Sequence, residues 1–288
     1  MIPEAGFSTP SPGARYHPEK LRPIWAGVLE QGRFRVRIAS SPVDIAGAQR
    51  FRASCFELSR EMEADCFDAI SDHVLIEDRH RGDLVGYFRM NLCEANAVAG
   101  TYSGQFYDLS PLQQHPGPML EIGRFCICPN EKGPDVLRLA WAFIAACVDR
   151  SQVCLLFGCT SFPEACGKKH RSGLQFLARR YVAPKIWCPK VKSAEFLRLE
   201  HSGLSEQSQG AAWSGLPPLL RSYLAMGGWV SDHAVVDRAL DTLHVFTGLE
   251  VSRIPMSRKA RLRAVYKQCG QSTDMSPTKA VDLTRASA

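Results

Sequence analysis

The chain has 288 residues, of which 45% are hydrophobic and 22% charged, and its formal net charge is +6. This composition is typical of a soluble globular protein, and the length predicts one core of about 200 residues with extensions. The 11 cysteines include no Cys-x-x-Cys pair. That pattern argues against a disulfide framework and a structural zinc site, and we expect no metal.

The sequence also argues against a membrane-spanning or secreted protein. The longest apolar run, Leu139 to Val148, is about half as long as a membrane-spanning helix, and residues 1–30 lack the apolar segment of a secretory signal. We therefore expect a cytoplasmic protein in a reducing compartment, or one that is peripheral at the inner membrane. Basic clusters at residues 168–171 and 253–267 indicate an acidic partner or an anionic surface; the modest net charge leads us to expect no nucleic-acid partner.

The N-terminal part of the chain predicts an arm, a strand and a helix. Residues 1–32 are rich in proline and are expected to form a mobile arm. Residues 33–38 alternate basic and apolar side chains, which predicts a strand with one solvated face. A helix then opens with Pro42 in its first turn, and its apolar stripe leaves Arg50 and Arg52 off the core face. That stripe consists of Ile45, Ala48, Phe51, Cys55 and Leu58.

An acidic loop and a hairpin follow this helix. Residues 61–72 are rich in carboxylates, and two extended segments at 73–77 and 84–92 are joined by a glycine-containing turn, which predicts a β-hairpin. Residues 94–118 are rich in glycine and proline and are expected to be irregular.

A strand, a helix and a second strand are predicted in the middle of the chain. The strand at 120–128 is apolar except for Glu121 and Arg124, and after a polar loop an amphipathic helix spans 136–149, capped by Asp135. The buried strand at 153–158 should lie parallel to the first, because such crossovers are right-handed and join parallel neighbours.

The C-terminal part predicts two helices, two late strands and a tail. The helices are expected at 174–181 and 216–226, and the strands at 229–236 and 243–247. These elements describe an α+β or mixed α/β protein whose central twisted mixed sheet is flanked by helices. The predicted organisation is an arm at 1–32, a domain at 33–255 and a basic, polar tail at 256–288.

Four segments, in this order, carry a family resemblance. They are residues 65–68 with 72–75 behind them, 120–124, 156–163 and 216–221. Together they resemble the acyltransferases of the GNAT superfamily, and within it the L-ornithine N-alpha-acyltransferases of ornithine lipid synthesis. This branch is similar in turn to the acyl-homoserine-lactone synthases and the N-acyl amino acid synthases. The resemblance covers roughly residues 33–255 and implies a GNAT-like fold.

The same resemblance implies an N-acyltransferase that moves a 3-hydroxyacyl chain from acyl carrier protein to the alpha-amine of ornithine. The product would be lyso-ornithine lipid for membrane lipid biosynthesis. Other interpretations stay open: the same chemistry on glutamine or lysine, a signal synthase of the acyl-homoserine-lactone type, or a non-catalytic module that binds lipid or carrier protein.

The donor prediction depends on the loop before the central helix. The phosphate-binding pattern of the superfamily would begin at Lys132, and it places Asp135 and Leu137 where small residues are expected. A carboxylate repels phosphate and a leucine side chain keeps the backbone away from it, so the pyrophosphate of coenzyme A should fit badly; Asp135 as a plain helix cap is the alternative. We therefore expect the acyl-phosphopantetheine of acyl carrier protein as co-substrate, and no further cofactor. The predicted donor-binding residues are Ile122, Phe125, Cys126, Lys132 and Gly133.

By analogy with the related synthases, Glu121 and Arg124 are the candidate catalytic residues. Glu121 would accept the proton of the amine, directly or through water, and Arg124 would hold that carboxylate in place. A separation of three positions puts the two side chains on opposite faces of a strand unless a bulge intervenes. We therefore expect them to have different partners, and a buried ion pair with only a structural role is the alternative.

The amino-acid substrate requires charged partners of its own. Asp65 and Asp68 are predicted to receive its ammonium group, and Arg50 or Arg52 its carboxylate, although an acidic loop is also commonly only solvated. The histidines at 73, 170 and 233 have no visible partner and are expected to be structural. The basic tail at 258–267 has apolar residues between its charges, which indicates a surface helix on anionic lipid or a solvated terminal helix.

Overall fold

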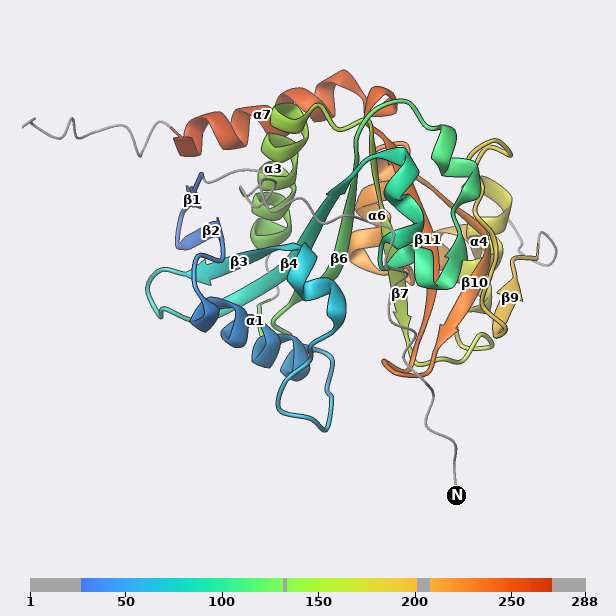
Figure 1. The fold of residues 1–288 in the computed structure, drawn as a ribbon, viewed down its shortest axis with the longest axis horizontal. Coiled ribbons are helices and arrows are strands. Elements are labelled where there is room, and N and C mark those ends of the chain that lie inside the picture. The colour runs from blue at the N-terminus through green and yellow to red at the C-terminus, as the bar shows by residue number, and fades with distance from the viewer. Residues whose placement is uncertain (1–26, 132–133, 201–207, 271–288) are drawn as a thin grey trace, which may run out of the picture.

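A nine-stranded mixed sheet forms the centre of the computed structural model, which describes residues 27–131, 134–200 and 208–270. The strand order is β1-β2-β3-β4-β6-β7-β11-β10-β9 (Figure 1). The bounds are β1 Leu29–Gln31, β2 Phe34–Ile38, β3 Asp72–Asp78, β4 Leu84–Cys93, β6 Met119–Ile127, β7 Leu155–Pro163, β9 Phe196–Arg198, β10 Trp229–Asp237 and β11 Thr242–Glu250. A separate two-stranded sheet joins β5 Tyr107–Asp108 to β8 Lys190–Val191.

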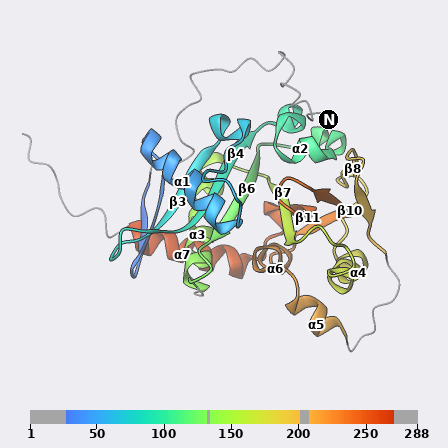
Figure 2. The same ribbon diagram turned by 90° about the horizontal axis from the view of Figure 1, so that it is seen from below.

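Helices cover both faces of the sheet, as expected from the sequence. In Figure 2, α3, α4, α6 and α7 lie on one face and α1 and α2 on the other. The helices are α1 Pro42–Cys55, α2 Ser103–Phe106, α3 Pro134–Ser151, α4 Arg171–Arg180, α5 Gln209–Ser214, α6 Pro218–Ala225 and α7 Met256–Gly270. No helix in the described ranges is long and apolar enough to cross a bilayer.

The predicted hairpin, crossover and late strands are confirmed. β3 pairs antiparallel with β4, and β6 pairs parallel with β7, to which α3 connects it. Helix α1 begins where the sequence predicts, because the side chain of Ser41 accepts a hydrogen bond from the backbone N–H of Asp44 at 3.2 Å.

Two expectations about element ends were wrong. Residues 29–31, assigned to the arm, pair with β2 as strand β1. Helix α3 starts at Pro134, so Asp135 lies in its first turn and pairs with Arg138 rather than capping it. The tail begins as helix α7, in the stretch where the sequence indicated a helix, and its residues Leu262, Val265 and Tyr266 pack on the main core. Its Arg263 also holds Asp149 of α3 at 2.7 Å.

Strands β6 and β7 separate after a short contact. They are paired only from Met119 to Glu121 of β6; beyond this, β6 continues on β4 and β7 continues on β11 (Figure 1). Gly158 lies at the point of separation, where an added Cβ would overlap the carbonyl oxygen of Ile122. The absence of a side chain at 158 therefore lets the two backbones approach before they diverge.

The substitution Gly158→Ala should force these strands apart. We expect it to lower the free energy of unfolding by about 1–3 kcal/mol, the usual cost of overpacking, as measured by urea denaturation. Gly47→Ala is the matched control, since nothing lies within 4 Å of an added Cβ there. In helix α1 that change should be neutral or stabilising by up to about 1 kcal/mol. Equal stability of Gly158→Ala and wild type would contradict the close approach.

Candidate active site

A cleft of about 740 Å³ opens where β6 and β7 diverge. Residues of both strands line it, and so do the end of α1, the start of α6 and the β10–β11 turn. Polar side chains contributed by different elements meet there. They include Tyr102, Arg124, Cys159, Ser161, Tyr223, Arg238, Asp241 and His244.

A β-bulge in β6 determines which side chains reach this cleft. Tyr87 of β4 pairs with Cys126 and Arg89 with Gly123, so β6 carries one extra residue in this interval. Arg124 lies there with a φ of 53°, in the left-handed region that non-glycine residues seldom adopt. The bulge brings Arg124 to the same face as Glu121, and both contact Tyr102.

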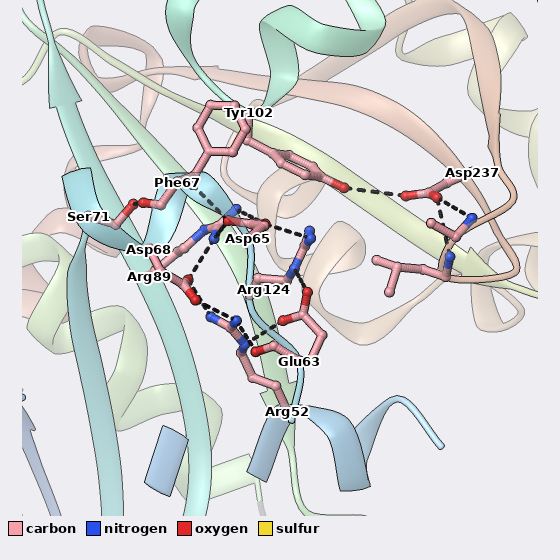
Figure 3. A network of polar contacts seen from close by, with 12 residues as sticks. Arg52, Glu63, Asp65, Phe67, Asp68, Ser71, Arg89, Tyr102, Arg124 and Asp237 are labelled. Carbon is pink, nitrogen blue, oxygen red and sulfur yellow. Dashed lines mark hydrogen bonds and ion pairs between the residues drawn. The ribbon is translucent and has the colours of Figure 1, made fainter. Parts of the chain in front are cut away.

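Arg124 belongs to a closed ring of alternating charges (Figure 3). Three arginines and three carboxylates alternate so that each group lies between two of opposite sign. The six are Arg52, Glu63, Arg124, Asp65, Arg89 and Asp68. The N–O distances around the ring, in order from the Arg52–Glu63 pair to the Asp68–Arg52 pair, are 2.5, 3.2, 2.8, 2.5, 2.8 and 2.6 Å. The ring thus ties α1, the loop after it, β4 and the bulge of β6 together.

Burial makes the ring depend on complete pairing. Arg52 is fully buried, so the expectation that it lies off the core face was wrong: its charge is matched by Glu63 and Asp68. Although burial favours the neutral acid, the guanidinium of Arg52 holds the pKa of Asp68 well below its usual range. The hydrogen bonds of Arg89 likewise outweigh burial and lower the pKa of Asp65.

Glu121 has different partners from Arg124, as the spacing led us to expect. Its carboxylate accepts hydrogen bonds from the N–H of Tyr102 at 3.1 Å, and from the N–H and hydroxyl of Ser103 at 2.7 Å each. Burial raises the pKa of Glu121, although the bonds from Ser103 oppose this. Its side chain is 5% exposed and lies behind the cleft-lining Tyr102.

The other predicted residues fall into two groups. Ile122, Phe125 and Cys126 line the cleft, whereas Lys132 and Gly133 lie outside the described residues. Of the predicted substrate ligands, Asp65, Asp68 and Arg52 are members of the ring, and Arg50 is exposed on α1. Substrate binding by these four residues stays a prediction.

Several cleft residues were not found from the sequence. Tyr102 lies directly before α2 in the segment 94–118, which was expected to be irregular because no periodicity marks its side chains. It donates a hydrogen bond from its hydroxyl to Asp237 at 3.3 Å. His244 is a polar residue inside the apolar strand β11, and that contrast is the one signal that would have found it.

Comparisons with known proteins agree with this architecture. Residues 48–142 match the model of the acetyltransferase (GNAT) domain. An L-ornithine N(alpha)-acyltransferase of Brucella abortus is 30% identical over 242 residues, which cover 77% of this chain and 86% of that protein. The chain belongs to the L-ornithine N(alpha)-acyltransferase family. A second member, from Rhodobacter capsulatus, is 27% identical over 79% of this chain and 93% of its own length.

Membership of the L-ornithine N(alpha)-acyltransferase family makes the chain an acyltransferase with a GNAT fold, as the sequence predicted.

Among solved structures, an N-acyl amino acid synthase from uncultured soil microbes is similar with a TM-score of 0.40 and 12% identity. It covers 78% of this chain and 97% of its own.

The buried ring predicts acid lability for this acyltransferase. The lowered pKa of Asp68 means that its ionised form stabilises the fold above the unfolded pKa of about 3.9, and that this contribution is lost as the pH falls below it. Asp68→Asn should lower the free energy of unfolding by about 3–5 kcal/mol at pH 7, because it leaves Arg52 partly unpaired. The gap to wild type should shrink towards pH 3 in urea melts.

Asp83→Asn serves as the control for this experiment. Asp83 lies beside the β3–β4 turn with a side chain 69% exposed, 3.6 Å from Arg81. Its substitution should leave the stability and its pH dependence nearly unchanged. A constant gap between wild type and Asp68→Asn from pH 7 to pH 3 would contradict the role given to the ring.

Proposed function

We propose that the chain transfers an acyl group from acyl carrier protein to the alpha-amine of ornithine, an amide-forming step of membrane lipid synthesis. The choice of ornithine is supported by the names of the relatives from Brucella abortus and Rhodobacter capsulatus. The observation that carries the proposal is the divergence of β6 from β7, which opens a cleft beside an unpaired strand edge.

The free edge of β6 suits the donor. From Ile122 to Ile127, β6 has no partner on the β7 side within the described residues. Its N–H and C=O groups therefore need hydrogen bonds, and a pantetheine arm carries two amides that supply them. Ile122, Phe125 and Cys126 line this edge and keep their predicted role in donor binding.

The start of α3 supports a carrier protein rather than coenzyme A. Asp135 lies in its first turn, paired with Arg138, and Leu137 lines the cleft. A carboxylate at this helix end opposes a pyrophosphate. Exposed Lys168, Lys169 and Arg171 follow shortly after the cleft-lining Glu164 and suit the acidic surface of a carrier protein.

The acceptor side combines Arg124 with the hydroxyl-bearing Tyr102. Arg124 Cζ lies 4.4 Å from the ring centroid of Tyr102, and both line the cleft. Arg124 keeps its predicted catalytic role, since a fixed guanidinium suits the carboxylate of an amino acid or the charge that develops on the thioester oxygen. Glu121 holds Tyr102 and Ser103 through hydrogen bonds and does not line the cleft, so its predicted role as proton acceptor is not part of this proposal.

Contact with a membrane would be electrostatic. Leu262, Val265 and Tyr266 of α7 pack on the main core, so these three side chains are not available for insertion. Arg258, Arg261 and Lys267 are exposed on the same helix. Peripheral binding to anionic lipid, and cytoplasmic localisation, remain predictions.

The assay is incubation of the purified chain with a 3-hydroxyacyl carrier protein and individual amino acids, followed by mass spectrometry. We expect acyl-ornithine to be the main product, and little product from the same acyl group on coenzyme A. Glutamine or lysine as the preferred acceptor would redirect the proposal to another amino acid. Absence of product with any amine would overturn it.

A charge-reversal variant tests the docking surface for the donor. The pair Lys168→Glu and Arg171→Glu should raise the KM for acyl carrier protein by about tenfold or more, because two attractive contacts become repulsive. The KM for a short acyl-pantetheine, which lacks the protein, should not change. An equal rise in the KM for both donors would show that Lys168 and Arg171 do not contact the carrier protein.

A further inference from the structure

His244 of β11 has an unusual position for a buried histidine. Its side chain is 1% exposed and lines the cleft. It points to the face of the sheet that carries Tyr107, because its neighbours Leu243 and Val245 face the core under α4 and α6. Tyr102 and Arg124 lie on the same face and line the same cleft.

Its hydrogen bonds define the tautomer. The hydroxyl of Tyr107 donates its one proton to the carbonyl oxygen of His244 at 2.9 Å, so at the 3.2 Å contact with Nδ1 the ring nitrogen must be the donor. Nδ1 therefore carries the hydrogen and Nε2 a free lone pair. Nε2 has no hydrogen-bond partner in the described part of the chain.

A buried acceptor without a hydrogen bond costs free energy unless a ligand donates the missing hydrogen bond. Burial lowers the pKa of His244 to about 4, with Arg124 and His233 acting in the same direction and Asp237 against them. The ring is thus neutral at physiological pH, with the lone pair of Nε2 unprotonated.

We propose that His244 Nε2 is the base that takes the proton from the attacking amine in the acyl transfer. The inference rests on the amide-forming function proposed above. The amine nitrogen forms a bond to the thioester carbon while His244 removes one of its protons. The C–S bond then breaks, and the leaving thiolate takes a proton back from the imidazolium or from water.

Glu121 is the rival base. Its oxygens already accept three hydrogen bonds, from Tyr102 and Ser103, and it does not belong to the cleft lining. His244 lines the cleft and lacks a partner. The geometry therefore assigns proton acceptance to His244 and the positioning of Tyr102 and Ser103 to Glu121.

Two substitutions remove the base in different ways. His244→Asn retains a donor towards Tyr107, and His244→Gln places an amide near the former Nε2; neither accepts a proton. We expect each to lower kcat by about a hundredfold or more, as for loss of a general base, with the KM for the amine changed by less than about threefold.

His233→Gln is the matched control. His233 lies on the adjacent strand β10 and is fully buried. Its ring centroid lies 5.1 Å from that of Tyr107, and its Nε2, like that of His244, has no hydrogen-bond partner among the described residues. It does not line the cleft. This variant should keep kcat within about threefold of wild type, whatever its stability.

A second measurement works on the wild-type protein. In ¹⁵N spectra of the histidine rings, saturating amine should shift the Nε2 signal of His244 and leave that of His233 unchanged. Wild-type-like kcat in a folded His244 variant, or no Nε2 shift, would overturn this inference alone. A wild type that acylates no amine would overturn the proposed function and this inference together.

Discussion

The bulge of β6 is the constraint on which the site depends. A non-glycine residue with a φ of 53° is strained, and Arg124 holds that conformation because its guanidinium closes a ring of six charges. Removing any member leaves its neighbours buried and partly unpaired, which is far more costly than losing an exposed ion pair. The ring therefore keeps the strand edge, and the residues on it, in one geometry.

Strand separation and the bulge serve the same end. Gly158 lets β7 approach Ile122 and then depart, while the bulge turns Arg124 towards Tyr102. Glu121 supports Tyr102 from behind through its backbone N–H. Neighbouring positions of β6 thus supply both the backbone groups that β7 leaves unpaired and the fixed charge of Arg124 beside them.

The sequence predicted the order and type of nearly all the main elements, because hydrophobic periodicity and capping residues such as Ser41 act locally. It did not place Arg52, since an arginine on a helix is expected to be solvated unless distant carboxylates meet it. Those carboxylates come from residues 63 and 68, and only the tertiary fold brings them together. Tyr102 and His244 were missed for the same reason: their roles arise from neighbours on other strands, which periodicity does not report.

The cleft lies between two strands, so side chains from both faces of the sheet line it. Leu137 and Leu219 border it on the face covered by α3 and α6, whereas Arg124, Tyr102 and His244 border it on the other. Under the proposed function, the acyl chain and the amine would therefore meet side chains that are separated by backbone. In that arrangement, substitutions at Leu137 or Leu219 would alter the space for the acyl chain without touching Arg124, Tyr102 or His244.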